Sequence, residues 1–116
     1  ATIRDQKAPV KYAIINNGHH GMVRQWQTLF YGRRYSQIET PGPDFVKLAE
    51  AYGMVGIQVT RKDEVEDAIR QATAHQGPVI VDFVVEVDER VYPMIPAGQS
   101  VNEMVEDILE GVEAQR

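Results

Sequence analysis

The segment best suited to chemistry is Asn16-Asn17-Gly18-His19-His20-Gly21, which follows the short apolar run of residues 12–15. Amide oxygens and backbone carbonyls are hard ligands of the kind that Mg²⁺ accepts, and substrate phosphates and waters usually complete its octahedron. Glycines at positions 18 and 21 let the backbone approach a ligand, and a helix beginning near Gly21 would aim its free N–H groups at a phosphate. By residue type and position, the segment is therefore a candidate site for a phosphate group and a magnesium ion.

A simpler interpretation of the same residues is a turn that ends a strand, since Asn and Gly tolerate left-handed backbone angles. A single glycine-containing turn between strand and helix is a weak signal for a ligand. Local sequence alone does not decide between the site and the turn.

Residues 21–32 have the spacing of a helix with one apolar stripe. Its members recur every three or four positions: Met22, Val23, Trp26, Leu29 and Phe30. On periodicity alone this stripe, including Trp26, is expected to pack in the core.

The elements around this segment alternate between strands and helices. Residues 12–15, 56–60 and 78–85 predict strands, and the last of these should be central because it is dense in β-branched residues. Helices are predicted over 43–53, over 63–77 behind a Thr60/Asp63 capping box, and from Val101 to Val112 behind a Ser100/Glu103 capping box. The pattern predicts an α/β fold: about three strands and four helices of a doubly wound parallel sheet, amounting to part of one domain spanning 1–116.

Composition excludes several classes of protein. A net charge of −5 over 116 residues argues against a nucleic-acid surface, and no apolar run approaches the length of a membrane span. There are no cysteines, so disulfides and thiolate metal sites are excluded. The absence of an initiator Met and of a signal segment predicts a fragment of a longer protein, and the lack of cysteine suits the cytosol.

Several strings of this sequence resemble the thiamine-diphosphate-binding domain of acetolactate synthase catalytic subunits, also called acetohydroxyacid synthases. The strings are residues 14–26, with Gly21-Met22-Val23-Arg24-Gln25-Trp26 at their end, residues 44–53, and residues 91–98 with Tyr92-Pro93-Met94-Ile95-Pro96. The combination of the Trp26 string with the Tyr92 string is specific to this branch, and the likeness covers nearly the whole chain. It implies the C-terminal part of the domain, with residues 91–116 as a C-terminal loop and helix.

The resemblance implies a role for each site residue. The side-chain oxygen of Asn17 and the backbone carbonyl of His19 would be Mg²⁺ ligands. Trp26 would narrow the pocket for the second substrate and favour 2-ketobutyrate over pyruvate. Ala97 and Gly98 would belong to the loop over the substrate channel. The residues that would line the thiamine diphosphate are Asn17, His19, His20, Gly21, Met22 and Val23.

The resemblance also implies what lies outside this chain. The Gly-Asp-Gly string that begins the family's motif, with its metal-binding aspartate, does not occur here. The isolated chain is therefore expected to be inactive. The parent enzyme would act on pyruvate and 2-ketobutyrate in branched-chain amino-acid biosynthesis, bind FAD in another domain, and form a homodimer or higher oligomer with a regulatory small subunit.

Two other functions stay open on the sequence. One is a different thiamine-diphosphate-dependent decarboxylase or carboligase with the same fold. The other is a non-catalytic module of flavodoxin or receiver type, although a receiver needs acidic residues where the strand of residues 12–15 ends in amides.

Overall fold

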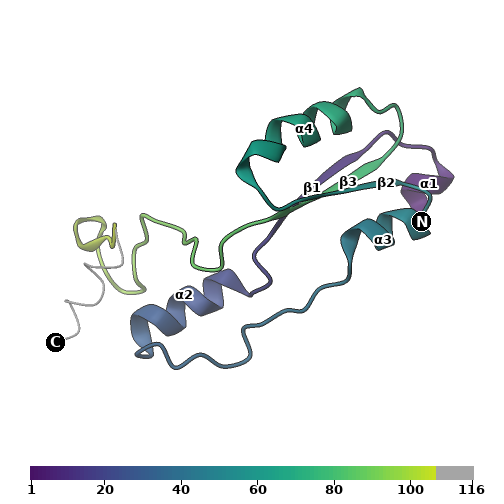
Figure 1. Cartoon of the computed structure of the whole chain (residues 1–116). Helices are drawn as coiled ribbons and strands as arrows, with labels where there is room; N and C mark the ends of the chain where they lie inside the picture. Colours follow the sequence, from purple (N-terminus) through teal and green to yellow (C-terminus); the bar gives the residue numbers. More distant parts are fainter. Residues whose placement is uncertain (107–116) are drawn as a thin grey trace. The chain divides into compact units, whose positions relative to one another are not determined.

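A computed structural model describes residues 1–106 and shows three strands and four α-helices in two compact units (Figure 1). Among the described residues, the first unit comprises 1–18 and 41–86, and the second comprises 19–40 and 87–106. The elements of the first unit are α1 (Thr2–Asp5), β1 (Lys11–Asn16), α3 (Phe45–Ala51), β2 (Val55–Val59), α4 (Val65–Ala74) and β3 (Val79–Val84). The second unit holds α2 (Gly21–Phe30).

The three strands form a parallel sheet in the order β1-β3-β2. Ile14 of β1 and Gln58 of β2 are both paired with Asp82 of β3. Parallel neighbours need crossover connections, which is why helical segments separate the strands in sequence. The predicted α/β class and the central place of the most β-branched strand are confirmed.

One face of the sheet carries the apolar core of the first unit, beneath α4. The small side chains of Ala68 and Ala72 let this helix lie close to the strands. The buried members of the core are Val59, Ala68, Ala72, Val79 and Val81. Residues 79–82 of β3 are all buried, as expected of a central parallel strand whose two faces are both covered.

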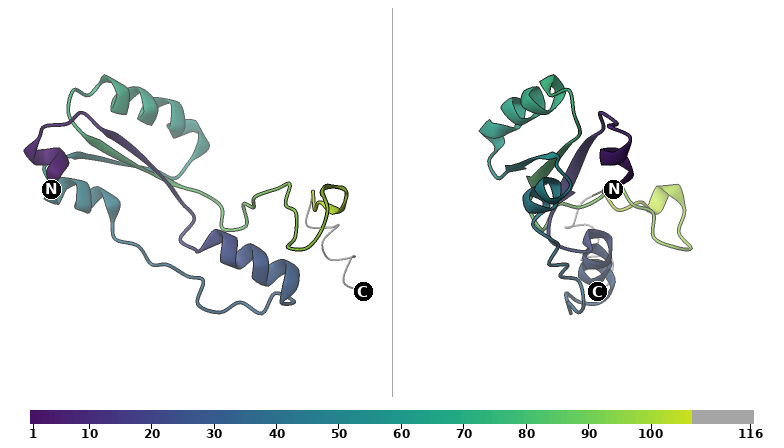
Figure 2. Two further views of the ribbon diagram at one scale, coloured as in Figure 1. Left: turned by 180° about the vertical axis from the view of Figure 1, so that it is seen from behind. Right: turned by 90° about the vertical axis from the view of Figure 1, so that its right-hand side faces the viewer.

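The opposite face is covered by α3 (Figure 2). Asp44 caps this helix, because its Oδ1 accepts a hydrogen bond of 3.0 Å from the Lys47 backbone N–H. Gly56 lies directly beneath it, where a Cβ would come within 2.8 Å of the Cα of Val46. The glycine is thus required for the close approach of α3 to β2.

The predicted capping box before α4 is corrected. Glu64, not Asp63, forms the capping contacts before α4, since its Oε2 accepts from the backbone N–H groups of Thr60 and Arg61 at 3.2 Å. Asp63 instead pairs with the Arg61 side chain.

The predicted helix from Val101 to Val112 is wrong over the part that is described. Residues Val101–Glu103 form a single 3-10 turn, and Val105 then makes an antiparallel bridge to Met94. The Ser100/Glu103 capping contact does form, with the Ser100 backbone N–H 2.9 Å from Glu103 Oε2. The remainder of that prediction lies outside the described residues, and the fourth helix is α1.

None of the helices within residues 1–106 is long and apolar enough to cross a membrane.

Candidate functional site

The end of β1 shows how the two asparagines differ. The Asn16 side-chain oxygen accepts a hydrogen bond of 3.0 Å from the Gly18 backbone N–H, and its carbonyl accepts from the Val85 N–H at 3.0 Å. Asn16 therefore forms the turn that ends the strand, as the simpler interpretation proposed. Asn17 is partly buried. The turn formed by Asn16 neither supports nor contradicts the predicted metal-binding role of Asn17.

Gly18 completes that turn with a φ of +64°, in the left-handed region that glycine adopts without strain. No atom lies within 4 Å of the position that a Cβ would occupy. Another residue at position 18 would adopt this backbone conformation only with strain, although there is space around the glycine for a ligand to approach.

In the second unit, α2 begins after the exposed residue His20. His20 precedes the helix, makes no capping hydrogen bond with its side chain, and donates its backbone N–H to the Ile38 carbonyl at 2.8 Å. His19 forms a bridge with Glu39. The first turn, which starts Gly21-Met22-Val23, contains no acidic residue. The first N–H groups of a helix have no carbonyl partner within it, so this turn can bind an anionic group.

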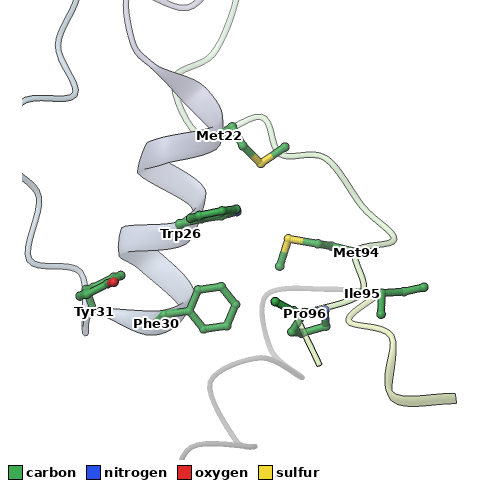
Figure 3. Close-up of a pocket in the computed structure, with 8 residues that line it drawn as sticks. Met22, Trp26, Phe30, Tyr31, Met94, Ile95 and Pro96 are labelled. Carbon is green, nitrogen blue, oxygen red and sulfur yellow. The ribbon is translucent and has the colours of Figure 1, made fainter. Parts of the chain in front are cut away.

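An apolar cavity of about 520 Å³ lies within the second unit (Figure 3). Side chains of α2 line one wall, and the chain around Met94 lines the other. The lining residues are Met22, Trp26, Phe30, Tyr31, Met94, Ile95, Pro96 and Ala97. Three predicted site residues, Met22, Trp26 and Ala97, are thus brought together. A cavity of this size and apolar character suits a small organic ligand.

Four of the five residues in the predicted apolar stripe of α2 are exposed, and only Leu29 is buried. Met22, Trp26 and Phe30 are 46%, 53% and 41% exposed, and they follow one another at four-residue spacing along the cavity. The buried residues of α2 are Leu29, from the predicted stripe, and the polar residues Gln25 and Thr28. The expectation that Trp26 packs in the core is therefore wrong, because the large apolar side chains of this helix face a cavity.

Gln25 and Thr28 were missed as buried residues because both are polar. Their burial is satisfied by hydrogen bonds: the Gln25 amide pairs with the backbone of Val91, and Thr28 Oγ1 donates to the Arg24 carbonyl at 2.9 Å. The spacing of Gln25 with Leu29, at i and i+4, was the available signal.

An ion pair flanks this region of the second unit. The Arg24 guanidinium donates from Nη2 to Asp88 Oδ1 at 2.7 Å and lies 4.3 Å from the Tyr35 ring centroid. These hydrogen bonds lower the pKa of Asp88 from its ordinary value of 3.8. Asp88 is largely exposed, so solvent weakens the pair.

Val23 and Gly98, two other predicted site residues of the second unit, are not among the residues that line the cavity. Val23 is 46% exposed, and Gly98 adopts a φ of +86° next to Ala97 without lining the cavity. Over residues 1–106, no group of three or more His, Cys, Asp or Glu side chains is arranged to hold a metal ion. Any metal held here would rely on amide or carbonyl oxygens, which are the donors Mg²⁺ takes alongside phosphate and water.

Three comparisons with known proteins agree with this architecture. Residues 1–83 match the family described as "Thiamine pyrophosphate enzyme, C-terminal TPP binding domain". The chain is 48% identical to the acetolactate synthase large subunit of Mycobacterium tuberculosis, over 96% of this chain and 20% of that protein. It is 50% identical to the acetolactate synthase of Mycobacterium avium, over 90% of this chain and 18% of that protein.

A solved structure shares the fold. It is the thiamine diphosphate-dependent 4-hydroxybenzoylformate decarboxylase of Rhodococcus jostii RHA1, with a TM-score of 0.66 and 29% identity over 73% of this chain and 16% of that one. The chain spans about a fifth of the length of the curated relatives it matches.

The parallel sheet has helices on both faces, and β1 is followed by a turn with a left-handed glycine. This arrangement is typical of α/β domains that bind a cofactor beyond the carboxyl ends of their strands. Within that class, the chain belongs to the thiamine pyrophosphate enzyme family, as part of its C-terminal cofactor-binding domain.

Proposed function

We propose that this chain is part of an acetolactate synthase, which condenses pyruvate with a second pyruvate or with 2-ketobutyrate and releases CO₂. The observation that carries the proposal is the cavity that joins Trp26 to Met94 and Ala97. These residues come from the two strings whose combination is specific to this branch. The similarity to mycobacterial acetolactate synthases over nearly the whole chain supports the same assignment.

Thiamine diphosphate and Mg²⁺ would be held through the segment that follows β1. Asn17 would contribute its side-chain oxygen and His19 its carbonyl to the metal, both hard donors. His20 and the start of α2 would contact the diphosphate, where the absence of acidic side chains in the first turn favours an anion. When bound, the cofactor would supply the electron sink for decarboxylation, and the protein would orient and shield it.

The cavity would receive the side chain of the second 2-ketoacid. Trp26 would narrow it, Met22 and Ala97 would bound it, and Gly98 would let the loop after Ala97 turn away through its positive φ. The apolar walls would help to keep water away from a bound ketoacid.

The larger protein would bring what this chain lacks. We infer a cytoplasmic enzyme of valine and isoleucine synthesis, with FAD in another domain, a homodimeric or larger assembly and a regulatory small subunit. The Gly-Asp-Gly motif with its metal-binding aspartate would also come from the parent, so the 116-residue chain alone would be inactive.

Product analysis of the full-length parent tests the function. Given pyruvate, thiamine diphosphate and Mg²⁺, it should form acetolactate, and with added 2-ketobutyrate it should form acetohydroxybutyrate. Release of an aldehyde without acetolactate would contradict the proposal. That result would favour a decarboxylase, the activity in the printed name of the structural relative.

Substitution of Asn17 tests the metal site separately. Asn17→Ala should raise the Mg²⁺ and cofactor concentrations needed for half-maximal activity by about tenfold or more, because a hard oxygen ligand is lost. Asn17→Asp keeps an oxygen donor and should be affected less. Cofactor titrations that match the wild type in Asn17→Ala would remove Asn17 from the site.

A further inference from the structure

The side-chain amide of Gln25 pairs with the backbone of Val91 in both directions. Its Nε2 donates to the Val91 carbonyl at 3.0 Å, and its Oε1 accepts from the Val91 N–H at 2.9 Å. Nε2 also lies 3.5 Å from the sulfur of Met94. Gln25 is only 1% exposed, so loss of either hydrogen bond would leave a buried polar group without a partner.

This pairing joins the two segments that form the walls of the cavity. Gln25 precedes Trp26 on α2, and Val91 lies three residues before Met94, where the second wall begins. The Arg24–Asp88 pair is a second link between the same segments. That link is exposed and screened by salt, so it constrains the segments less than the buried amide does.

We propose that Gln25 is a positioning residue that sets the distance between Trp26 and the Met94–Ala97 wall of the cavity. A glutamine pairing with a peptide group through both amide atoms fixes position and orientation together, as a strand neighbour would. The consequence for substrate choice rests on the proposed function, whereas the structural part does not.

The same helix provides a matched control in Gln27. Its Nε2 donates to the Ser36 carbonyl at 3.0 Å, and its Oε1 accepts from the Ser36 N–H at 2.9 Å. The chemistry is identical, but Ser36 does not line the cavity. Gln27→Met should therefore release residue 36 and leave the cavity unchanged.

The first test uses the 116-residue chain, in which Trp26 is the only tryptophan. Gln25→Met removes both hydrogen bonds and fills a similar volume. Amide hydrogen exchange at Val91 should rise about tenfold or more, equivalent to ~1.4 kcal/mol. Acrylamide quenching of Trp26 fluorescence should rise as well, because the opposite wall moves away. Gln27→Met should accelerate exchange at Ser36 only.

A second variant separates positioning from a general loss of structure. Gln25→Asn keeps both amide groups on a side chain one methylene shorter, so the pair with Val91 can form only if the two segments shift. Exchange at Val91 should stay slower than in Gln25→Met, while quenching of Trp26 should still differ from that of the wild type. If far-UV circular dichroism shows that Gln25→Met does not fold, this variant decides. Trp26 quenching that is unchanged in the folded variants, or equally changed by Gln27→Met, would overturn the proposal.

The full-length parent gives the functional readout. Gln25→Met should change the ratio of acetohydroxybutyrate to acetolactate more than the rate of pyruvate consumption, and Gln27→Met should change neither. An unchanged ratio would contradict a role in substrate choice. If the parent forms no acetolactate at all, the proposed function fails, while exchange at Val91 and quenching of Trp26 still test the pairing.

Discussion

Each of the two units of this chain is stabilised by a different kind of interaction. In the first, buried side chains such as Val79 and Val81 form a continuous apolar core under α4. In the second, the buried side chains of α2 include Gln25 and Thr28, which are satisfied by hydrogen bonds, and the large side chains of Met22, Trp26 and Phe30 line a cavity. An apolar core stabilises without direction, whereas hydrogen bonds fix positions. The first unit thus has a packed apolar core, whereas in the second unit hydrogen bonds fix the positions of side chains around an apolar cavity.

The largest expected effect separates the two faces of α2. Leu29→Ala should lower the free energy of unfolding by about 2–5 kcal/mol, because Leu29 is 3% exposed. Trp26→Ala should lower it by less than about 1 kcal/mol, although it removes more atoms, since Trp26 is 53% exposed. Urea denaturation of both variants measures the difference. Equal losses would mean that Trp26 is part of the core after all.

A smaller effect should come from the sheet of the first unit. Gly56→Ala should cost about 1–3 kcal/mol, because its Cβ would meet the backbone of Val46 at 2.8 Å and α3 would have to shift. Gly42→Ala is the control, since its Cβ would lie at an ordinary 3.6 Å from the Phe45 ring. Thermal unfolding should rank them in that order, and an equally stable Gly56→Ala would contradict the close packing of α3.

The smallest effect should be the response to acid in both units. Hydrogen bonds from Arg24 lower the pKa of Asp88, and hydrogen bonds from Lys47, led by its backbone N–H, lower that of Asp44. A carboxylate with a lowered folded pKa contributes stability that is complete above its ordinary value and is lost as pH falls through the folded value. Unfolding measured from pH 5 down to about pH 2 should therefore show a loss that begins near the ordinary pKa of 3.8.

Charge removal isolates each contribution. Asp88→Asn and Asp44→Asn should each lose less stability between pH 5 and about pH 2 than the wild type, and Asn still caps a helix at position 44. Acid profiles parallel to that of the wild type would show that neither pair matters to stability.

The scaffold could be predicted from sequence because its physics is periodic. A dense run of β-branched residues placed β3 at the centre of the sheet, and Asp44 with Gly53 marked the ends of α3. The start of α4 was less certain, because Asp63 and Glu64 offer the same carboxylate one residue apart. Only the backbone of Thr60 and Arg61 selects Glu64.

The second unit could not be predicted in the same way. Periodicity locates an apolar stripe but does not say whether that stripe meets a core or a cavity, so Trp26 was placed wrongly by spacing alone. Only the resemblance to acetolactate synthases predicted that Trp26 lines a pocket. Phe30, Tyr31 and Pro96 were not predicted as lining residues, and the pairing of Gln25 with Val91 joins residues 66 positions apart.

The most direct test of the account is the product ratio of the full-length parent carrying Trp26→Leu. Pyruvate and 2-ketobutyrate are supplied together, and acetolactate and acetohydroxybutyrate are quantified. Tyr52→Leu is the control, because Tyr52 is another half-exposed aromatic residue and lies at the end of α3. The account predicts that Trp26→Leu lowers the share of acetohydroxybutyrate and that Tyr52→Leu does not. A share unchanged by Trp26→Leu would contradict the assignment of the cavity to the second substrate.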